Sequence, residues 1–182
     1  QEKNTCLDIG CGTGAISFAL RQNGGNWHSI DSDENCVSLT KNLVKNQVYQ
    51  MDATKTNFEN NKFDTVIALD IIEHIDDDDS LVKELSRILK EDGKLYVTTP
   101  HMGRFAILNH IKNIIGLKPE KYGHIRAGYT TNQLKQKLEN NGFIVEKTGT
   151  YSKFFTELIE LVINKSYTLM NKNKTKGYNT DV

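Results

Sequence analysis

Short apolar runs alternate with longer amphipathic stretches over most of the chain, and this alternation limits the fold more than any other feature. A parallel strand is buried on both faces and is a nearly continuous apolar run, whereas a covering helix has an apolar stripe with a period of 3.6 residues. Strands that alternate with such helices predict a parallel sheet enclosed between helices. We therefore expect a doubly wound α/β fold, with a mostly parallel sheet and helices on both faces.

The same patterns predict the individual elements. Strands are expected over residues 6–9, 27–30, 47–51, 63–69, 94–99 and 143–145. Three helices are expected over Ala15–Gln22, from Glu34 (with Val37, Leu39, Leu43 and Val44), and around Leu81, Leu85, Ile88 and Leu89 before a turn at residues 91–93. A fourth helix begins after a cap at Thr130 or Thr131 and ends at Asn141-Gly142.

The rest of the chain supplies three further segments. We expect a binding domain over residues 1–150, with a helical insertion at about residues 101–129 that lies over the site as a lid. An apolar helix over residues 151–170 and a disordered tail over residues 171–182 follow it. Residues 104–117 form an apolar stretch with nearby lysines, which fits a packed lid or a peripheral membrane contact. The first strand begins almost at once, which suggests that the chain was trimmed.

Composition excludes several classes of protein. The 23 basic and 23 acidic residues leave no net charge, so we expect no nucleic-acid partner. Cys6, Cys11 and Cys36 form no CxxC pair, which indicates reduced thiols in a cytoplasmic protein. No apolar run approaches the roughly 20 residues that cross a bilayer. The 182 residues favour one domain, as a monomer or a homodimer.

Glycines mark the turn between the first strand and the first helix. Gly10, Gly12 and Gly14 stand where a backbone can approach a ligand closely and where a positive φ costs a glycine little. Together with Ala15 they also match the dinucleotide pattern G-x-G-x-x-G/A. The glycines alone therefore leave a nicotinamide dinucleotide and S-adenosylmethionine open as cofactors.

Acidic residues lie at or just after the carboxyl ends of four expected strands and favour the second cofactor. Asp8, Asp31, Asp52 and Asp70 occupy these positions, and Asp31 lies about twenty residues after Gly10, where a carboxylate can accept ribose hydroxyls. The carboxyl ends of parallel strands meet at one crevice. A ring of carboxylates there repels a pyrophosphate and suits a sulfonium ligand that carries an ammonium group.

The motifs LDIGCGTG, MDA, FDTVIALDIIEHI and LKEDGKLYVTTP, in this order, resemble class I S-adenosylmethionine-dependent methyltransferases over about residues 5–150. The nearest resemblance is to small-molecule methyltransferases of ubiquinone and menaquinone biosynthesis. It implies a Rossmann-like fold and S-adenosyl-L-methionine as cofactor. It also implies cofactor contacts from Asp8, Gly10, Gly12 and Gly14 to the methionine part, from Asp31 beside Ser32 to the ribose, from Asp52 and Ala53 to the adenine, and from Leu69 and Asp70 at the far wall.

The resemblance also implies a reaction, which is methyl transfer to a small-molecule or lipid-linked acceptor, expected at oxygen. His124 is the favoured general base, because a His before the Thr130 helix matches the quinone O-methyltransferases, and His101 is second. Either imidazole could instead only hold the insertion closed. Those enzymes carry an acid-x-x-Glu-His segment that can hold a divalent metal. For the corresponding Asp70, Glu73 and His74 we expect no metal, and we expect the acidic run 76–79 to be a solvated helix start.

Two alternatives remain open. A domain that keeps the fold and binds the cofactor without catalysis would carry the same motifs. An NAD-dependent oxidoreductase would share the glycine pattern, although the chain has no room for a separate substrate domain and the ring of acids disfavours a dinucleotide.

Overall fold

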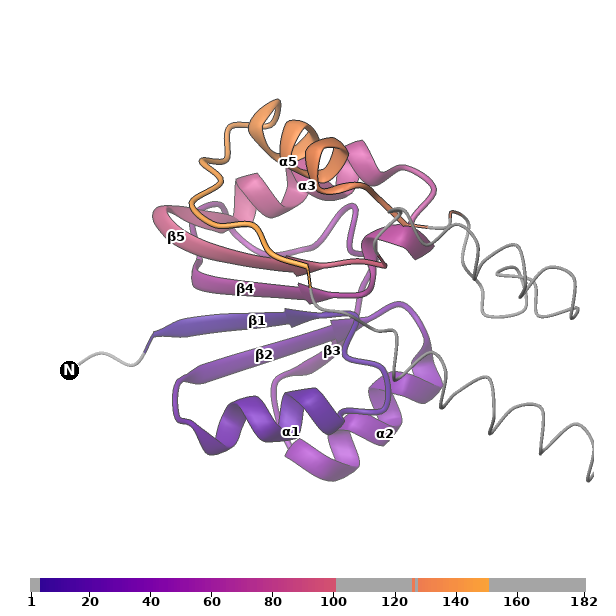
Figure 1. The fold of residues 1–182 in the computed structure, drawn as a ribbon. Coiled ribbons are helices and arrows are strands. Elements are labelled where there is room, and N and C mark those ends of the chain that lie inside the picture. The colour runs from indigo at the N-terminus through magenta and orange to yellow at the C-terminus, as the bar shows by residue number, and fades with distance from the viewer. Residues whose placement is uncertain (1–3, 101–125, 127, 151–182) are drawn as a thin grey trace, which may run out of the picture. The chain divides into compact units, whose positions relative to one another are not determined.

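The computed structural model describes residues 4–100, 126 and 128–150, almost all of them within one compact unit, residues 1–148. Five strands form its sheet, and Figure 1 labels them: β1 (Thr5–Ile9), β2 (Asn26–Asp31), β3 (Val48–Gln50), β4 (Phe63–Leu69) and β5 (Leu89–Thr98). The helices are α1 (Ala15–Gln22), α2 (Glu34–Val44), α3 (Asp78–Ile88) and α5 (Thr131–Glu139), with a short 3₁₀ helix, η1 (Ile72–His74).

All neighbouring strands in the sheet are parallel, in the order β3-β2-β1-β4-β5. The order reverses between β1 and β4, so the chain winds outward in both directions from the middle of the sheet. Because crossovers between parallel strands are right-handed, winding in opposite directions puts α1 and α2 on one face and α3 on the other. Figure 1 shows α1 and α2 beside β2 and β3, and α3 with α5 beyond β4 and β5. The expected doubly wound α/β fold is confirmed, with a sheet that is parallel throughout.

The main core lies between the sheet and α3. Leu7 and Ile9 of β1 and Val66 of β4 are fully buried there, against a stripe of buried residues on α3. That stripe recurs every three or four residues and consists of Leu81, Val82, Leu85 and Ile88. Burial of this stripe holds α3 against the sheet, because each buried aliphatic side chain stabilises the folded state by about 1.5–3 kcal/mol relative to an exposed one.

Side chains at the helix starts confirm two of the expected boundaries. Asp33 accepts hydrogen bonds from the N–H groups of Asn35 and Cys36 at the start of α2. Thr130 and Gln133 form a reciprocal capping box at the start of α5. Gly142, at a φ of 89°, follows the end of α5 as expected.

Five expectations about elements were wrong. Leu89 belongs to β5 rather than to the preceding helix, and the expected turn at residues 91–93 lies within β5, where its register with β4 shifts. Residues 143–145 form no strand. On α2, Leu39 and Leu43 are half exposed, and the buried face is formed by Val37, Thr40 and Val44. The expected solvation of the acidic run fails at Asp78, which is only 7% exposed.

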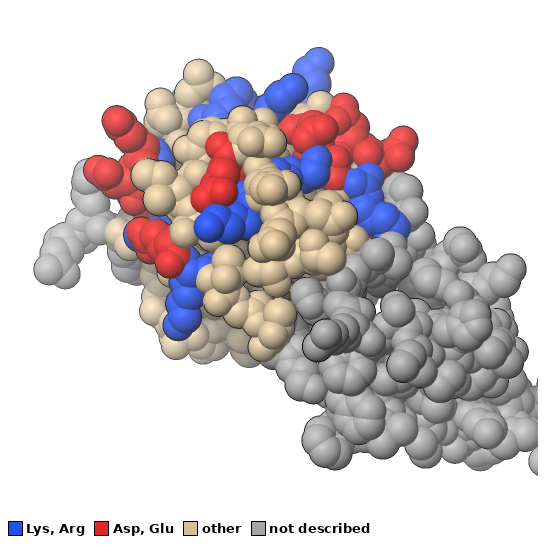
Figure 2. All heavy atoms as spheres, turned by 45° about the horizontal axis from the view of Figure 1, so that its top comes forward, with Lys and Arg blue, Asp and Glu red and all other residues tan. Residues whose placement is uncertain are grey.

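Several expectations lie outside the described residues. These include nearly all of the insertion at 101–129, the membrane-contact stretch 104–117, the apolar helix at 151–170, the tail at 171–182, and His101 and His124. Among the described residues, no helix is long and apolar enough to cross a membrane. Figure 2 shows acidic and basic side chains interspersed on the face it presents, in keeping with the zero net charge of the chain.

Candidate cofactor site

The turn after β1 is fixed by hydrogen bonds of its own backbone. The N–H groups of Gly10 and Cys11 both donate to the carbonyl oxygen of Ile30, at 2.9 and 3.0 Å. The N–H of Gly14 donates to the carbonyl oxygen of Cys11 at 2.9 Å, and no side chain caps α1 at Gly14. Unpaired N–H groups in the first turn of α1 are therefore available to an anionic group of a ligand. Burial raises the pKa of the Cys11 thiol to about 11, so it remains neutral.

The three glycines of this turn all have positive φ, but their surroundings differ. A Cβ at Gly10 would stand 2.7 Å from Ile71 Cδ1, and a Cβ at Gly14 would stand 2.7 Å from Thr40 Oγ1. A Cβ at Gly12 would meet no atom within 4 Å. Gly10 and Gly14 therefore permit close packing inside the protein, whereas Gly12 faces open space in which a ligand can approach the backbone.

Asp31, at the end of β2, is tied to the same turn. Its Oδ2 accepts the N–H of Gly12 at 2.8 Å, and its Oδ1 accepts the N–H of Asp33 at 3.0 Å. Each carboxylate oxygen can accept a further hydrogen bond, so Asp31 retains the capacity to bind ribose hydroxyls. Ser32 is exposed beside it, and its carbonyl oxygen accepts a hydrogen bond from Gln50 Nε2 at 3.0 Å.

The residues expected around the adenine follow β3. The Asp52 side chain is exposed and closes a local turn by accepting from the N–H and the hydroxyl of Thr54, both at 2.8 Å. Ala53 is buried in the main core. The N–H of Met51 donates to the carbonyl oxygen of Asp31 at 3.0 Å, so this segment is joined directly to the end of β2.

The residues expected at the far wall lie after β4, next to the turn after β1. Leu69 ends β4 and is half buried, while Asp70 is exposed at a φ of 48°. Asp70 Oδ1 accepts the hydroxyl of Thr98 at 3.0 Å, and its N–H donates to the Thr98 carbonyl at 3.1 Å. Because β1 and β4 flank the point where the strand order reverses, this is the edge at which open α/β sheets bind ligands.

Asp8 differs from the other three acids, because its side chain is buried between β1 and α1. It accepts a hydrogen bond from the Ser17 hydroxyl, and Ser17 lies 3.0 Å from the Ser29 hydroxyl, which also accepts from Arg21 Nη1 at 3.0 Å. Burial raises the pKa of Asp8, against the lowering effects of Ser17 and Arg21. Direct contact between Asp8 and a cofactor stays a prediction, and three exposed or half-buried acids remain at the edge of the sheet.

Comparison with known proteins agrees with this geometry. Residues 7–97 match the family model described as a methyltransferase domain, which is half of the chain. The ubiquinone biosynthesis O-methyltransferase of Pelagibacter ubique is 31% identical over 97 residues, covering 51% of this chain and 40% of that protein. The enzyme of the same name from Coxiella burnetii (strain RSA 331) is 25% identical over 154 residues, covering 80% of this chain and 66% of that protein.

The chain belongs to the class I S-adenosylmethionine-dependent methyltransferases. The fold agrees, since a SAM-dependent methyltransferase from Methanosarcina mazei superposes with a TM-score of 0.67 at 20% identity, covering 81% of this chain and 82% of that chain. S-adenosyl-L-methionine is the cofactor of this family, which decides against a nicotinamide dinucleotide. The chain spans 40% and 66% of the two curated relatives.

A metal site of the kind some quinone methyltransferases carry does not assemble from the described residues. Within residues 4–100, 126 and 128–150, no three His, Cys, Asp or Glu side chains are grouped to hold a metal ion. Asp70 is exposed, whereas Glu73 is completely buried. Among the described residues, neither carboxylate oxygen of Glu73 makes a hydrogen bond of good geometry, and the buried Thr99 hydroxyl is close enough only to oppose the effect of burial on the pKa of Glu73. Burial raises the pKa of Glu73.

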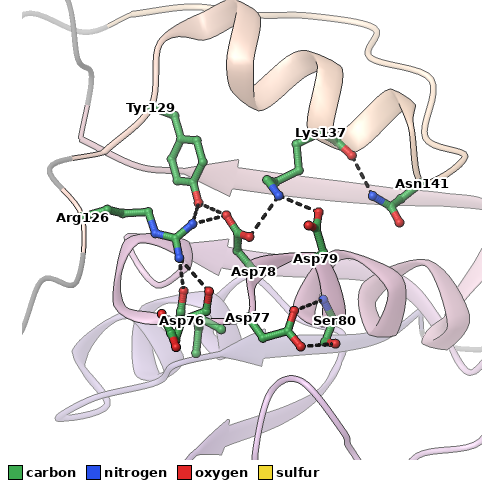
Figure 3. A network of polar contacts seen from close by, with 10 residues as sticks. Asp76, Asp77, Asp78, Asp79, Ser80, Arg126, Tyr129, Lys137 and Asn141 are labelled. Atoms are coloured by element: carbon green, nitrogen blue, oxygen red, sulfur yellow. Dashed lines mark hydrogen bonds and ion pairs between the residues drawn. The ribbon is translucent and has the colours of Figure 1, made fainter.

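A polar network anchors the chain where it returns from the insertion to the domain (Figure 3). The Arg126 guanidinium contacts Asp78 and donates to the carbonyl oxygens of Ile75 and Asp76, both at 2.8 Å. The Tyr129 hydroxyl donates to Asp78, and Lys137 Nζ of α5 lies 3.0 Å from the same carboxylate. The Tyr129 N–H donates to the Pro100 carbonyl at 3.0 Å. Residues 100 and 129 therefore meet at the carboxyl edge of the sheet.

Three residues that shape the candidate cofactor site had not been expected from the sequence. Ile71 packs against Gly10, Thr98 bonds Asp70, and Thr40 on α2 bonds the carbonyl oxygen of Gly12. Thr40 had a signal in the sequence, because it is the polar member of an otherwise apolar helix face. Nothing in the sequence pattern marks Ile71 or Thr98 as neighbours of the site.

Proposed function

We propose that this chain transfers a methyl group from S-adenosylmethionine to a hydroxyl oxygen of a small-molecule acceptor. The observation that supports this most strongly is the open turn at Gly12 beside Asp31, which offers a cofactor site inside a methyltransferase domain. The acceptor and its atom are inferred from two curated relatives named ubiquinone biosynthesis O-methyltransferase. A lipid-linked acceptor and a peripheral membrane contact through residues 104–117 are part of the same proposal.

When bound, the cofactor supplies an activated methyl group on a sulfonium. Methyl transfer to the acceptor oxygen would leave the electron pair of the broken carbon–sulfur bond on sulfur, and the chain would have to supply a base for the hydroxyl proton. Alignment of acceptor and methyl group supplies most of the acceleration. We propose that the glycine turn, Asp31 and Ser32, Asp52 and Ala53, and Leu69 and Asp70 hold the cofactor for this displacement.

The insertion is proposed to select the acceptor, because Pro100 and Tyr129, the described residues on either side of most of it, are hydrogen-bonded to each other beside the proposed cofactor edge. His124 within it is the proposed base and His101 the second candidate. His124→Ala should lower kcat by about 10²- to 10⁴-fold and leave the affinity for S-adenosylhomocysteine unchanged. Full turnover by His124→Ala would show that His124 is not the base, and catalysis would then rest on the alignment of the acceptor with the methyl group.

The direct test incubates the full chain with S-adenosylmethionine labelled in its methyl group and with phenolic compounds or an extracted lipid fraction. We expect label in a methyl ether, identified by mass spectrometry, and none when S-adenosylhomocysteine is in excess. A chain that binds S-adenosylhomocysteine but labels no acceptor would support the alternative of a cofactor-binding domain without catalysis. Label on nitrogen or carbon would overturn the choice of oxygen.

A further inference from the structure

Gly12 is the least constrained residue of the cofactor turn, yet its backbone is held on both sides. Its N–H donates to Asp31 Oδ2 at 2.8 Å, and its carbonyl oxygen accepts from Thr40 Oγ1 at 3.0 Å. The two bonds fix the peptide planes before and after Gly12, and so both of its soft dihedral angles. No atom lies within 4 Å of the position of a Cβ at Gly12, so no side-chain packing does this instead.

Thr40 reaches the turn from an element that the cofactor motif does not include. It lies in the middle of α2 and is completely buried. Thr40 also packs against a second glycine, since a Cβ at Gly14 would stand 2.9 Å from its Cα. One helix residue thus contacts the turn at two points, by a hydrogen bond at Gly12 and by close packing at Gly14.

Asp31 and Thr40 belong to consecutive parts of the chain. Asp31 ends β2, its Oδ1 accepts the N–H of Asp33, and Asp33 in turn caps α2. The strand end that carries the ribose-binding carboxylate and the helix that carries Thr40 are therefore joined directly, and both bind the same glycine residue.

We propose that Thr40 is a positioning residue of the cofactor site, whose hydroxyl holds the Gly12 turn in its binding conformation before the cofactor arrives. The inference rests on the proposed use of this turn in cofactor binding. A glycine loses more conformational entropy on ordering than any other residue. If the turn is already ordered before the cofactor arrives, this loss of entropy does not weaken binding. Without the Thr40 hydroxyl, part of the conformational entropy of the turn is lost only when the cofactor binds, and the affinity falls.

The test is calorimetric titration of the full chain with S-adenosylhomocysteine. Thr40→Val keeps the shape of the side chain and removes the hydroxyl, so we expect the Kd to rise about 3- to 10-fold. Thr40→Ser restores the hydroxyl and should bind within about twofold of the wild type. Thr40→Ala supplies the same comparison if Thr40→Val does not fold.

Val44→Ala is the matched control, because Val44 is buried one helical turn further along α2 and has no polar group. It should lower Tm and leave the Kd unchanged. Unchanged affinity in Thr40→Val, equal losses in Thr40→Ser and Thr40→Val, or weaker binding by Val44→Ala in step with its Tm would each overturn the proposal. A wild-type chain that does not bind S-adenosylhomocysteine would overturn the proposed function as well, which separates the two failures.

Discussion

The three glycines of the cofactor turn form one motif in the sequence, but they are not all required for the same physical reason. Gly10 and Gly14 are glycines because Ile71 and Thr40 occupy the space of a side chain, whereas Gly12 faces open space. The sequence pattern located the turn correctly but could not separate these causes, because they depend on residues from η1 and α2. The motif therefore predicts the position of the turn better than it predicts what each of its glycines contacts.

Alanine substitutions separate the two kinds of glycine. Gly12→Ala places a methyl group in open space and should cost only about 1–2 kcal/mol of stability for its positive φ, while it obstructs the cofactor. Gly14→Ala should cost more, because its Cβ would stand 2.9 Å from Thr40 Cα. Thermal unfolding and titration with S-adenosylhomocysteine measure both effects. Full cofactor affinity in a folded Gly12→Ala variant would show that Gly12 does not face the cofactor.

Glu73 gives a prediction about pH, because its carboxyl group is completely buried and makes no hydrogen bond of good geometry to another described residue. Burial raises its pKa in the folded state above the ordinary value of 4.5. The folded state therefore binds this proton more tightly than the unfolded state, and stability falls as pH rises from about that value. Glu73→Gln stays neutral, so it should stabilise the protein at pH 7 by about 1–3 kcal/mol and give no gain near pH 4.

Glu84 is the matched control, because its pKa is shifted in the opposite direction from that of Glu73. It is also buried, but it accepts from the Thr56 N–H at 2.8 Å and pairs with Arg87 at 2.6 Å. Burial alone would raise the pKa of Glu84, but these partners outweigh it and lower the pKa. Glu84→Gln should therefore destabilise the protein at pH 7. Denaturant unfolding across this pH range tests both variants, and equal effects of the two substitutions would contradict the prediction.

At the scale of elements, α3 and α5 are joined by the Asp78 network. Burial alone would raise the pKa of Asp78, but hydrogen bonds from Tyr129 and Lys137 outweigh it and lower the pKa. Asp78→Asn removes a buried charge with two cationic partners, and we expect a loss of about 2–3 kcal/mol in the free energy of unfolding at pH 7. Asp79 is exposed and pairs with Lys137, so Asp79→Asn should lower the free energy of unfolding by less than about 1 kcal/mol.

Denaturant unfolding of the two variants measures this difference. Equal losses in Asp78→Asn and Asp79→Asn would show that the acidic run acts as a solvated helix start, as the sequence suggested. The sequence could not reveal the network because its partners, Arg126 and Lys137, lie about 50 residues further along the chain.

Regular elements were predictable wherever local pattern and tertiary packing agree. The strand at Phe63–Leu69 and the helix at Ala15–Gln22 have the bounds expected from the sequence. The expectations failed at Leu89 and at residues 143–145, where Phe143 packs against the core but Ile144 is exposed. Leu89 pairs with Phe63 in the sheet instead of continuing α3.

At the scale of the whole molecule, the parallel sheet reverses its strand order between β1 and β4 and brings the residues that we propose for the cofactor site to one edge. The doubly wound sheet was predictable because alternating strands and helices permit few topologies, and the acids at or just after the strand ends indicated this edge as the candidate site. It did not predict that Asp8 would be buried against Ser17, or that α2 would hold the turn through Thr40.

The most direct test of the proposed site is calorimetric titration of the full chain and its Asp31→Ala variant with S-adenosylhomocysteine. We predict micromolar-range binding by the wild type, no binding of NAD, and a loss of about 1–3 kcal/mol in Asp31→Ala, which removes the partner of the ribose and of Gly12. Asp33→Ala, which loses only the cap of α2, should lower Tm and keep this affinity. Binding of NAD without S-adenosylhomocysteine, or unchanged affinity in Asp31→Ala, would contradict the proposed cofactor site.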